Sequence, residues 1–143
     1  MSTKNFRYIS KNISKLYRAS LVYINENLKE FNITSSEYLY IINIPEDKSV
    51  NLTYLSKKLY VDPSLTTKVI NNLVKKGFIE KIKSKNDKRA YDINLTKQGI
   101  EIKPKILKVL ESWNDVITKE MDIIEKENIL NSLETMSTNA ENR

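Results

Sequence analysis

The sequence contains no cysteine and no histidine. Without thiols the chain forms no disulfide and has neither a thiolate nucleophile nor a redox-sensing sulfur. Without imidazole it has no Ser-His-Asp triad and no histidine ligand for a metal ion. There is also no glycine-rich phosphate loop. We therefore expect no enzyme activity, no cofactor and no metal site.

Glycine and proline are scarce, with 2 and 3 copies in 143 residues, which argues against a loop-rich or all-β fold. No stretch is long and apolar enough to span a bilayer. The first residues, MSTKNFRYISKN, have no apolar segment of the kind found in signal peptides. These absences predict a mainly helical protein in the cytoplasm, with no membrane partner.

Charge is plentiful and unequal in sign. The chain has 24 Lys and Arg against 18 Asp and Glu, a formal net charge of +6, and 40% of its residues are hydrophobic. The apolar content is enough for one core at this length. The positive surplus favours a polyanion such as nucleic acid as partner.

Two short helices are predicted in the centre of the chain, over residues 51–59 and 63–76. Leucines recur at helical spacing in the first, behind Asn51, which can accept a hydrogen bond from a free amide of the first turn. Asp62 and Pro63 supply a cap and a first-turn proline for the second. This is the pattern of a helix-turn-helix.

A hairpin is predicted directly after these helices. Gly77 suits the left-handed position that ends a helix. Residues 78–83 and 90–95 have strand character, and the polar residues 84–89 between them favour a turn. The hairpin would carry a charged tip.

Four motifs occur in this segment in a fixed order: a leucine-rich stretch before the proline, a glycine after the second helix, an Asp-x-Arg pair in the turn, and a Leu-Thr-x-x-Gly that opens the next helix. Their residues are Leu55, Leu59, Val61, Pro63 and Ser64; Leu73, Gly77, Phe78 and Ile79; Asp87 and Arg89; and Leu95, Thr96 and Gly99. In this order and spacing they resemble the multiple-antibiotic-resistance regulator (MarR) family of winged-helix transcription regulators. The resemblance implies a mainly α (α+β) fold, a winged helix-turn-helix with N- and C-terminal helices that form a dimerisation region.

The flanking sequence predicts further helices over residues 6–28, 38–44, 96–118 and 121–136. We expect Thr34 or Ser35 to cap the second of these, and residues after Ser137 to be frayed. The terminal helices carry more apolar surface than one winged helix can cover, which favours a two-fold homodimer over a monomer with a larger helical core. The resemblance implies the same division within a single domain, 1–31 and 97–143 for dimerisation and 34–96 for the winged helix-turn-helix.

The second helix of the helix-turn-helix has one core face and one polar face. If the protein binds double-stranded DNA, this helix is the one suited to the major groove, where its polar side chains would meet base edges or phosphates. The sequence leaves open whether Leu65 or Thr66 faces outward. The candidate contacts are Ser64, Leu65, Thr66, Thr67, Lys68, Asn71 and Lys75.

The hairpin tip supplies a second group of candidates, Lys85, Asp87, Lys88 and Arg89. The basic side chains would follow the backbone, and Arg89 would enter a narrow minor groove. Asp87 would be repelled by phosphate. We therefore expect it to hydrogen-bond the loop and orient the Arg89 guanidinium, and the resemblance gives this pair the same roles.

Members of the family often respond to a small aromatic acid, and Tyr17, Arg18 and Tyr38 are candidates to bind such an effector. The alternative is that the tyrosines belong to the core and Arg18 forms an ion pair. The function expected is a dimeric, sequence-specific regulator of transcription, a repressor on an inverted-repeat operator that a small aromatic ligand releases. A winged-helix protein-interaction module or a non-specific DNA-binding protein is the alternative.

Overall fold

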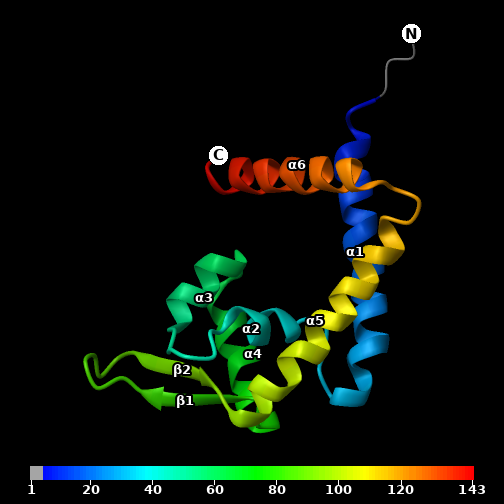
Figure 1. Cartoon of the computed structure of the whole chain (residues 1–143). Coiled ribbons are helices and arrows are strands. Elements are labelled where there is room, and N and C mark those ends of the chain that lie inside the picture. Colours follow the sequence, from blue (N-terminus) through cyan, green and yellow to red (C-terminus); the bar gives the residue numbers. More distant parts are fainter. Residues whose placement is uncertain (1–4) are drawn as a thin grey trace. The chain divides into compact units, whose positions relative to one another are not determined.

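The computed structural model describes residues 5–143, six α-helices and a two-stranded sheet (Figure 1). The chain divides into two compact units, one ending at Leu110 and one beginning at Glu111. This mainly helical winged-helix fold confirms the expected fold class. The elements are α1 (Tyr8–Leu28), the 3₁₀ turn η1 (Lys29–Phe31), α2 (Tyr38–Asn43), α3 (Leu52–Leu59), α4 (Pro63–Lys76), β1 (Ile79–Lys83), β2 (Tyr91–Leu95), α5 (Lys97–Ile117) and α6 (Ile123–Glu141).

The two helices of the helix-turn-helix begin and end where local signals predicted. The Asn51 side chain accepts a hydrogen bond from the Tyr54 N–H at 2.7 Å, and Asp62 accepts one from the Ser64 N–H at 2.8 Å. Gly77 ends α4 with φ of 86°, a conformation that costs glycine little. Caps at both ends therefore fix the length of α4.

The hairpin β1–β2 follows in antiparallel register, with Ile79 opposite Leu95 and Lys83 opposite Tyr91. An isolated bridge joins Val50 to Ile93 and attaches the strand pair to the segment before α3. The turn of the hairpin projects beyond the helices of the first unit (Figure 1). Residues 85–89 of this turn are all exposed.

The core lies in the first unit and is built largely from isoleucine. It takes side chains from α1, α2, α3, α4, both strands and the start of α5, so α4 packs on several elements at once. The buried apolar residues are Ile24, Leu28, Ile33, Tyr40, Ile41, Ile44, Leu55, Val69, Ile70, Leu73, Phe78, Ile79, Ile93, Ile102 and Ile106.

Two local predictions were wrong. The helix α2 begins at Tyr38 without a side-chain cap from Thr34 or Ser35; instead the Glu37 carboxylate accepts the Thr34 N–H at 2.9 Å. The helix α6 continues to Glu141, past Ser137, because no glycine or proline stops it. The helix therefore extends beyond its last apolar residues, because the residues that follow are compatible with a helix.

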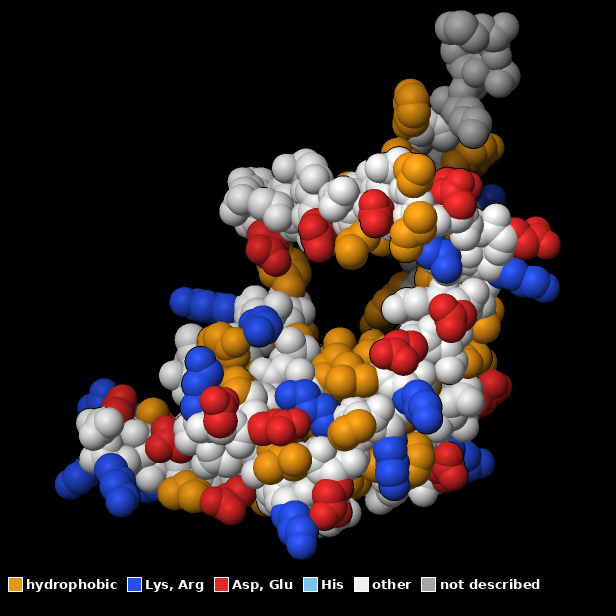
Figure 2. Space-filling view, in the orientation of Figure 1, with side chains coloured by type: hydrophobic (Ala, Val, Ile, Leu, Met, Phe, Trp, Pro, Cys, Tyr) orange, Lys and Arg blue, Asp and Glu red, His pale blue; other side chains and the backbone are white. Residues whose placement is uncertain are grey.

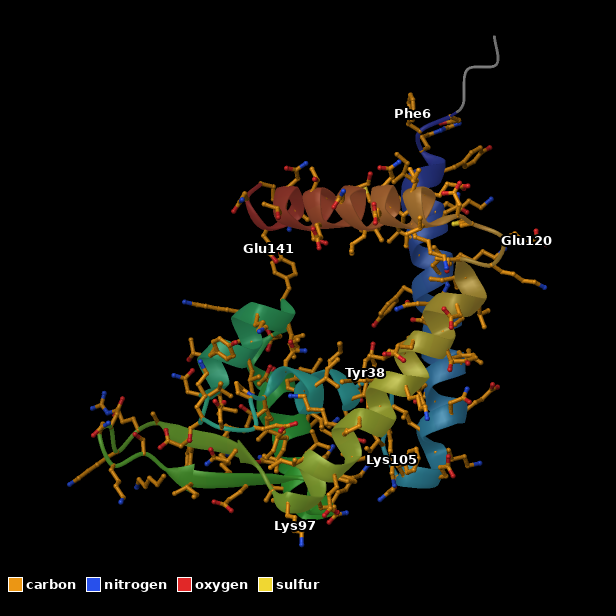
Figure 3. All side chains as sticks on the ribbon, in the orientation of Figure 1. Phe6, Tyr38, Lys97, Lys105, Glu120 and Glu141 are labelled. Carbon is orange, nitrogen blue, oxygen red and sulfur yellow. The ribbon has the colours of Figure 1, made fainter. Side chains whose placement is uncertain are left out.

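In the second unit, α6 begins at Ile123 and is capped by Asp122, whose side chain accepts the Glu125 N–H at 2.8 Å. None of its side chains is buried, and Ile123 and Ile124 are 66% and 65% exposed. In the first unit, α1 also exposes apolar side chains over its first turns, and Phe6 just before it is exposed as well (Figure 3).

Over residues 5–143 there is no helix with the length and apolar character needed to cross a bilayer. Residues 1–4, part of the expected N-terminal dimerisation segment, lie outside the described chain.

A partly buried ion pair ties the end of α4 to the segment that joins α1 to α2. Lys76 Nζ lies 2.7 Å from Glu37 Oε1 and donates to the Asn32 carbonyl oxygen at 2.8 Å. Glu37 is only 3% exposed. A carboxylate removed from water in this way requires a partner, because an unpaired buried charge is strongly destabilising.

Replacing Lys76→Met should lower the free energy of unfolding by about 2–3 kcal/mol, because Glu37 would be left buried without its cation. Chemical denaturation monitored by circular dichroism measures this. The matched control is Lys75→Met, an exposed neighbour on the same helix, which should change stability by less than about 0.5 kcal/mol. Equal losses in the two variants would show that the ion pair is not what holds this end of α4.

Candidate nucleic-acid interface

The helix α4 separates its side chains into two faces. Thr66, Val69, Ile70 and Leu73 point into the core. On the other side Thr67 is half-buried, and the remaining candidates are exposed: Ser64, Leu65, Lys68, Asn71 and Lys75. These six side chains form a largely polar and basic surface along α4, with Leu65 as its apolar member, and we call it the outer face of α4.

The structure decides between Leu65 and Thr66. Leu65 is 46% exposed, whereas Thr66 is fully buried and its Oγ1 lies 3.1 Å from the Tyr40 hydroxyl on α2. The expectation that Thr66 contacts a partner molecule is corrected, because its hydroxyl is used inside the protein. Leu65 remains on the outer face as its apolar member.

Two hydroxyls near the start of α4 are already engaged as donors. The Ser64 hydroxyl donates to Asp62 Oδ1, and Thr67 Oγ1 donates to the Pro63 carbonyl oxygen at 3.1 Å. The hydrogen bond from the Ser64 hydroxyl, and next that from the Ser64 N–H, lower the pKa of Asp62. Asp62 is thus held ionised at the positive end of the helix dipole, and both hydroxyls keep lone pairs that can accept.

Lys81 was missed by the sequence reasoning. It comes from β1, and its Nζ lies 3.3 Å from Asn71 Oδ1 on α4 and 4.4 Å from the centroid of the Tyr91 ring on β2. The only signal in the sequence is a lysine at an alternate strand position, which cannot be paired with Asn71 or Tyr91 until the register is known. The contact joins the outer face of α4 to the hairpin.

The hairpin tip is shaped by the carboxylate of Asp87. Asp87 Oδ1 accepts the Arg89 N–H at 2.9 Å, and the Ala90 N–H donates to the Asp87 carbonyl oxygen at 3.0 Å. The expected bond to the loop is therefore present, and it is made to the backbone of Arg89; a role for Asp87 in orienting the guanidinium stays a prediction. Lys85, Lys88 and Arg89 are exposed, and Figure 2 shows the Lys and Arg side chains gathered at the end of the hairpin.

The candidate effector residues Tyr17 and Tyr38 lie close enough to interact. Burial raises the pKa of Tyr38, labelled in Figure 3, and the nearby Tyr17 phenol raises it further. Tyr17 and Arg18 are exposed on α1. A role for the three in ligand binding stays a prediction. Within residues 5–143 no group of three or more acidic side chains could hold a metal ion.

Comparisons with known proteins agree with this geometry. Residues 33–91 match the sequence profile of the MarR family. The chain is 31% identical over 135 residues to the HTH-type transcriptional regulator BilQ of Clostridioides difficile strain CD3. The aligned region covers 93% of this chain and 91% of that protein. The chain belongs to the MarR family. Membership of a family of transcriptional regulators also confirms the expectation that it is not an enzyme.

Other relatives of this MarR-family chain include the HTH-type transcriptional regulator SarZ of Staphylococcus haemolyticus, 31% identical over 78% of this chain and 75% of that protein. Among solved structures, the MarR protein from Peptoclostridium difficile superposes with a TM-score of 0.91 at 28% identity, covering 99% of this chain and 93% of the other. The MarR transcriptional regulator from Methanosarcina mazei Go1 gives 0.88 at 28% identity, covering 94% and 96%. The similarity thus extends beyond the helix-turn-helix to nearly the whole chain.

Thr66→Val in this MarR-family chain should lower the free energy of unfolding by about 1–2 kcal/mol, because the buried Tyr40 hydroxyl loses its partner. Thermal or chemical denaturation measures the change. Leu65→Ala, one residue away but exposed, is the control and should stay within about 0.5 kcal/mol of the parent. Adding Tyr40→Phe to Thr66→Val should recover part of the loss; no recovery would mean that the hydroxyl pair is not its cause.

Proposed function

We propose that this protein is a homodimeric, sequence-specific DNA-binding regulator that acts as a repressor on an inverted-repeat operator. The observation that carries the proposal is the outer face of α4, with exposed Ser64, Lys68, Asn71 and Lys75, together with the exposed basic side chains Lys85, Lys88 and Arg89 of the hairpin tip. Such a regulator would work in the cytoplasm. A dimer bound over a promoter blocks polymerase without needing further contacts, which favours repression.

In the proposed complex α4 lies in the major groove and reads base edges. Lys68 and Asn71 can contact bases, Lys75 can reach a phosphate, and exposed Leu65 can touch a thymine methyl. Ser64 and Thr67 offer lone pairs to the exocyclic amines of adenine or cytosine. Thr66 takes no part, because it is buried.

The hairpin tip acts on the neighbouring backbone and minor groove in this proposal. Lys85 and Lys88 would neutralise phosphates, and Arg89 would enter a narrow minor groove where the potential is most negative. Asp87 supports Arg89 by fixing its backbone amide. The contact adds affinity over all sequences and a preference for A·T-rich flanks.

Dimerisation would cover the apolar side chains that α1 and α6 expose. On α6 these include Ile123, Ile124 and Leu130, and on α1 they include Ile9 and Val22. Solvated apolar surface on two helices of this length is commonly buried by a second copy in a two-fold interface. We therefore assign 1–31 and 97–143 to dimerisation and 34–96 to DNA binding.

We also propose that a small aromatic ligand binds the protein and releases it from the operator. The half-buried phenol of Tyr38 close to Tyr17 supports it, with Arg18 as a cation for an acidic ligand. A ligand bound there would change the spacing of the two recognition helices and so weaken binding to both half-sites at once.

Selection from a randomised duplex library at near-physiological salt tests the proposed function. A two-fold dimer should enrich an inverted repeat with half-site centres about one helical turn apart, roughly 34–36 Å. Affinity for it should fall steeply as salt rises, because bound phosphates release counterions. Enrichment of a single half-site would contradict the dimer, and retention without any enrichment would leave a non-specific basic protein.

Arg89→Ala should weaken binding to the selected operator by about ten-fold or more and reduce the preference for A·T-rich flanks, because the minor-groove cation is lost. Fluorescence anisotropy titration against operators with A·T-rich or G·C-rich flanks measures both effects. The control is Lys97→Ala, which removes one positive charge at the start of α5 (Figure 3). If Arg89→Ala binds as tightly as the parent, the hairpin tip has no part in the complex.

A further inference from the structure

We infer that Lys81 sets the base preference of Asn71, so that this asparagine selects guanine at its operator position instead of adenine. The inference rests on the proposed function and refines it. Asn71 lies on the outer face of α4, one helical turn after Lys68, where a side chain meets base edges in the proposed complex. Lys81 lies on β1 and has no other assigned role.

The contact fixes which end of the Asn71 amide faces outward. Lys81 Nζ lies 3.3 Å from Asn71 Oδ1. An ammonium group has only donors, so the amide must turn its oxygen, and not its amine, toward the lysine. The Nδ2 amine is then the end of Asn71 that remains free for a base.

Adenine is a poor match for this arrangement. An asparagine that reads adenine accepts from the N6 amine with its oxygen and donates to N7 with its amine. The oxygen of Asn71 keeps one lone pair, but an adenine N6 amine reaching it would bring partly positive hydrogens beside the Lys81 ammonium. Guanine presents two acceptors, O6 and N7, which match an amide N–H and a neighbouring ammonium.

The ring of Tyr91 holds Lys81 in place. Lys81 Nζ lies 4.4 Å from the ring centroid, within the range of a cation–π contact, and Tyr91 reaches it from the neighbouring strand β2. A free lysine would sample many rotamers, and holding it costs conformational entropy that the ring offsets. The cation is therefore positioned before DNA arrives.

The experiment compares variants on the inverted repeat selected by the parent protein. Asn71→Ala first identifies the position in each half-site at which discrimination is lost. The parent should favour guanine over adenine there by about five-fold or more, the low end for a good base contact. In Lys81→Met the Asn71 oxygen becomes free to accept, so the guanine-to-adenine ratio should fall by a similar factor.

Lys83→Met is the matched control, because it removes the same charge from an exposed position two residues along β1. It should reduce overall affinity without changing the base ratio. In an Asn71→Ala background, Lys81→Met should no longer affect the ratio. Circular dichroism melting curves for each variant separate these effects from loss of folding.

Each outcome decides something definite. Adenine at the Asn71 position in the parent, an unchanged ratio in Lys81→Met, or an equal change in Lys83→Met overturns the inference while the selected operator upholds the proposed function. An Asn71→Ala protein that keeps all its base preferences does the same. If no repeat is enriched at all, the proposed function fails first and the inference falls with it.

Discussion

The packing of one face of α4 against the isoleucine-rich core is the constraint on which the rest of the structure depends. Burying Thr66, Val69, Ile70 and Leu73 fixes the rotation of the helix about its own axis, and this alone decides which side chains form the outer face. Two contacts then hold the helix. The Tyr40 hydroxyl contacts the Thr66 hydroxyl near its beginning, and the Glu37 carboxylate pairs with Lys76 at its end. The orientation of the outer face therefore follows from the contacts that the opposite face and the end of α4 make within the first unit.

How much the sequence predicted depends on the range of the interaction. Asn51, Asp62 and Gly77 act on amides and carbonyls a few residues away, so the bounds of α3 and α4 could be placed from their neighbours alone. The choice between Leu65 and Thr66 could not, because both fit the helical period, and the hydroxyl of Tyr40, which accommodates the threonine hydroxyl inside the protein, lies 26 residues away in the sequence. Thus the helix was predictable, and the fine rotation of its face was not.

The missed residue, Lys81, illustrates the same limit in the candidate site. A lysine in a strand is ordinary, and its importance arises only when the register of β1 and β2 brings the Tyr91 ring within 4.4 Å and the hairpin packs beside α4. The prediction of where α6 ends was wrong for a different reason, because it depended on a local pattern and not on a distant contact. The apolar pattern fades after Met136, yet nothing in the last residues stops a helix, so backbone propensity carries it to Glu141.

The hydrogen-bonding character of the outer face changes along α4, from acceptors near its start to donors further along, and the helix backbone causes the first of these. At the start of α4, the Ser64 hydroxyl donates a hydrogen bond to Asp62 and the Thr67 hydroxyl donates one to the Pro63 carbonyl oxygen. The first turn of a capped helix offers acceptors of this kind. These hydroxyls are left as acceptors, while further along the helix Lys68 and the Asn71 amine present donors. For a helix in the major groove, acceptors favour the amines of adenine and cytosine, and donors favour guanine. In the proposed complex with DNA, the position at which α4 begins would therefore set the order of base types along the sequence that the helix contacts.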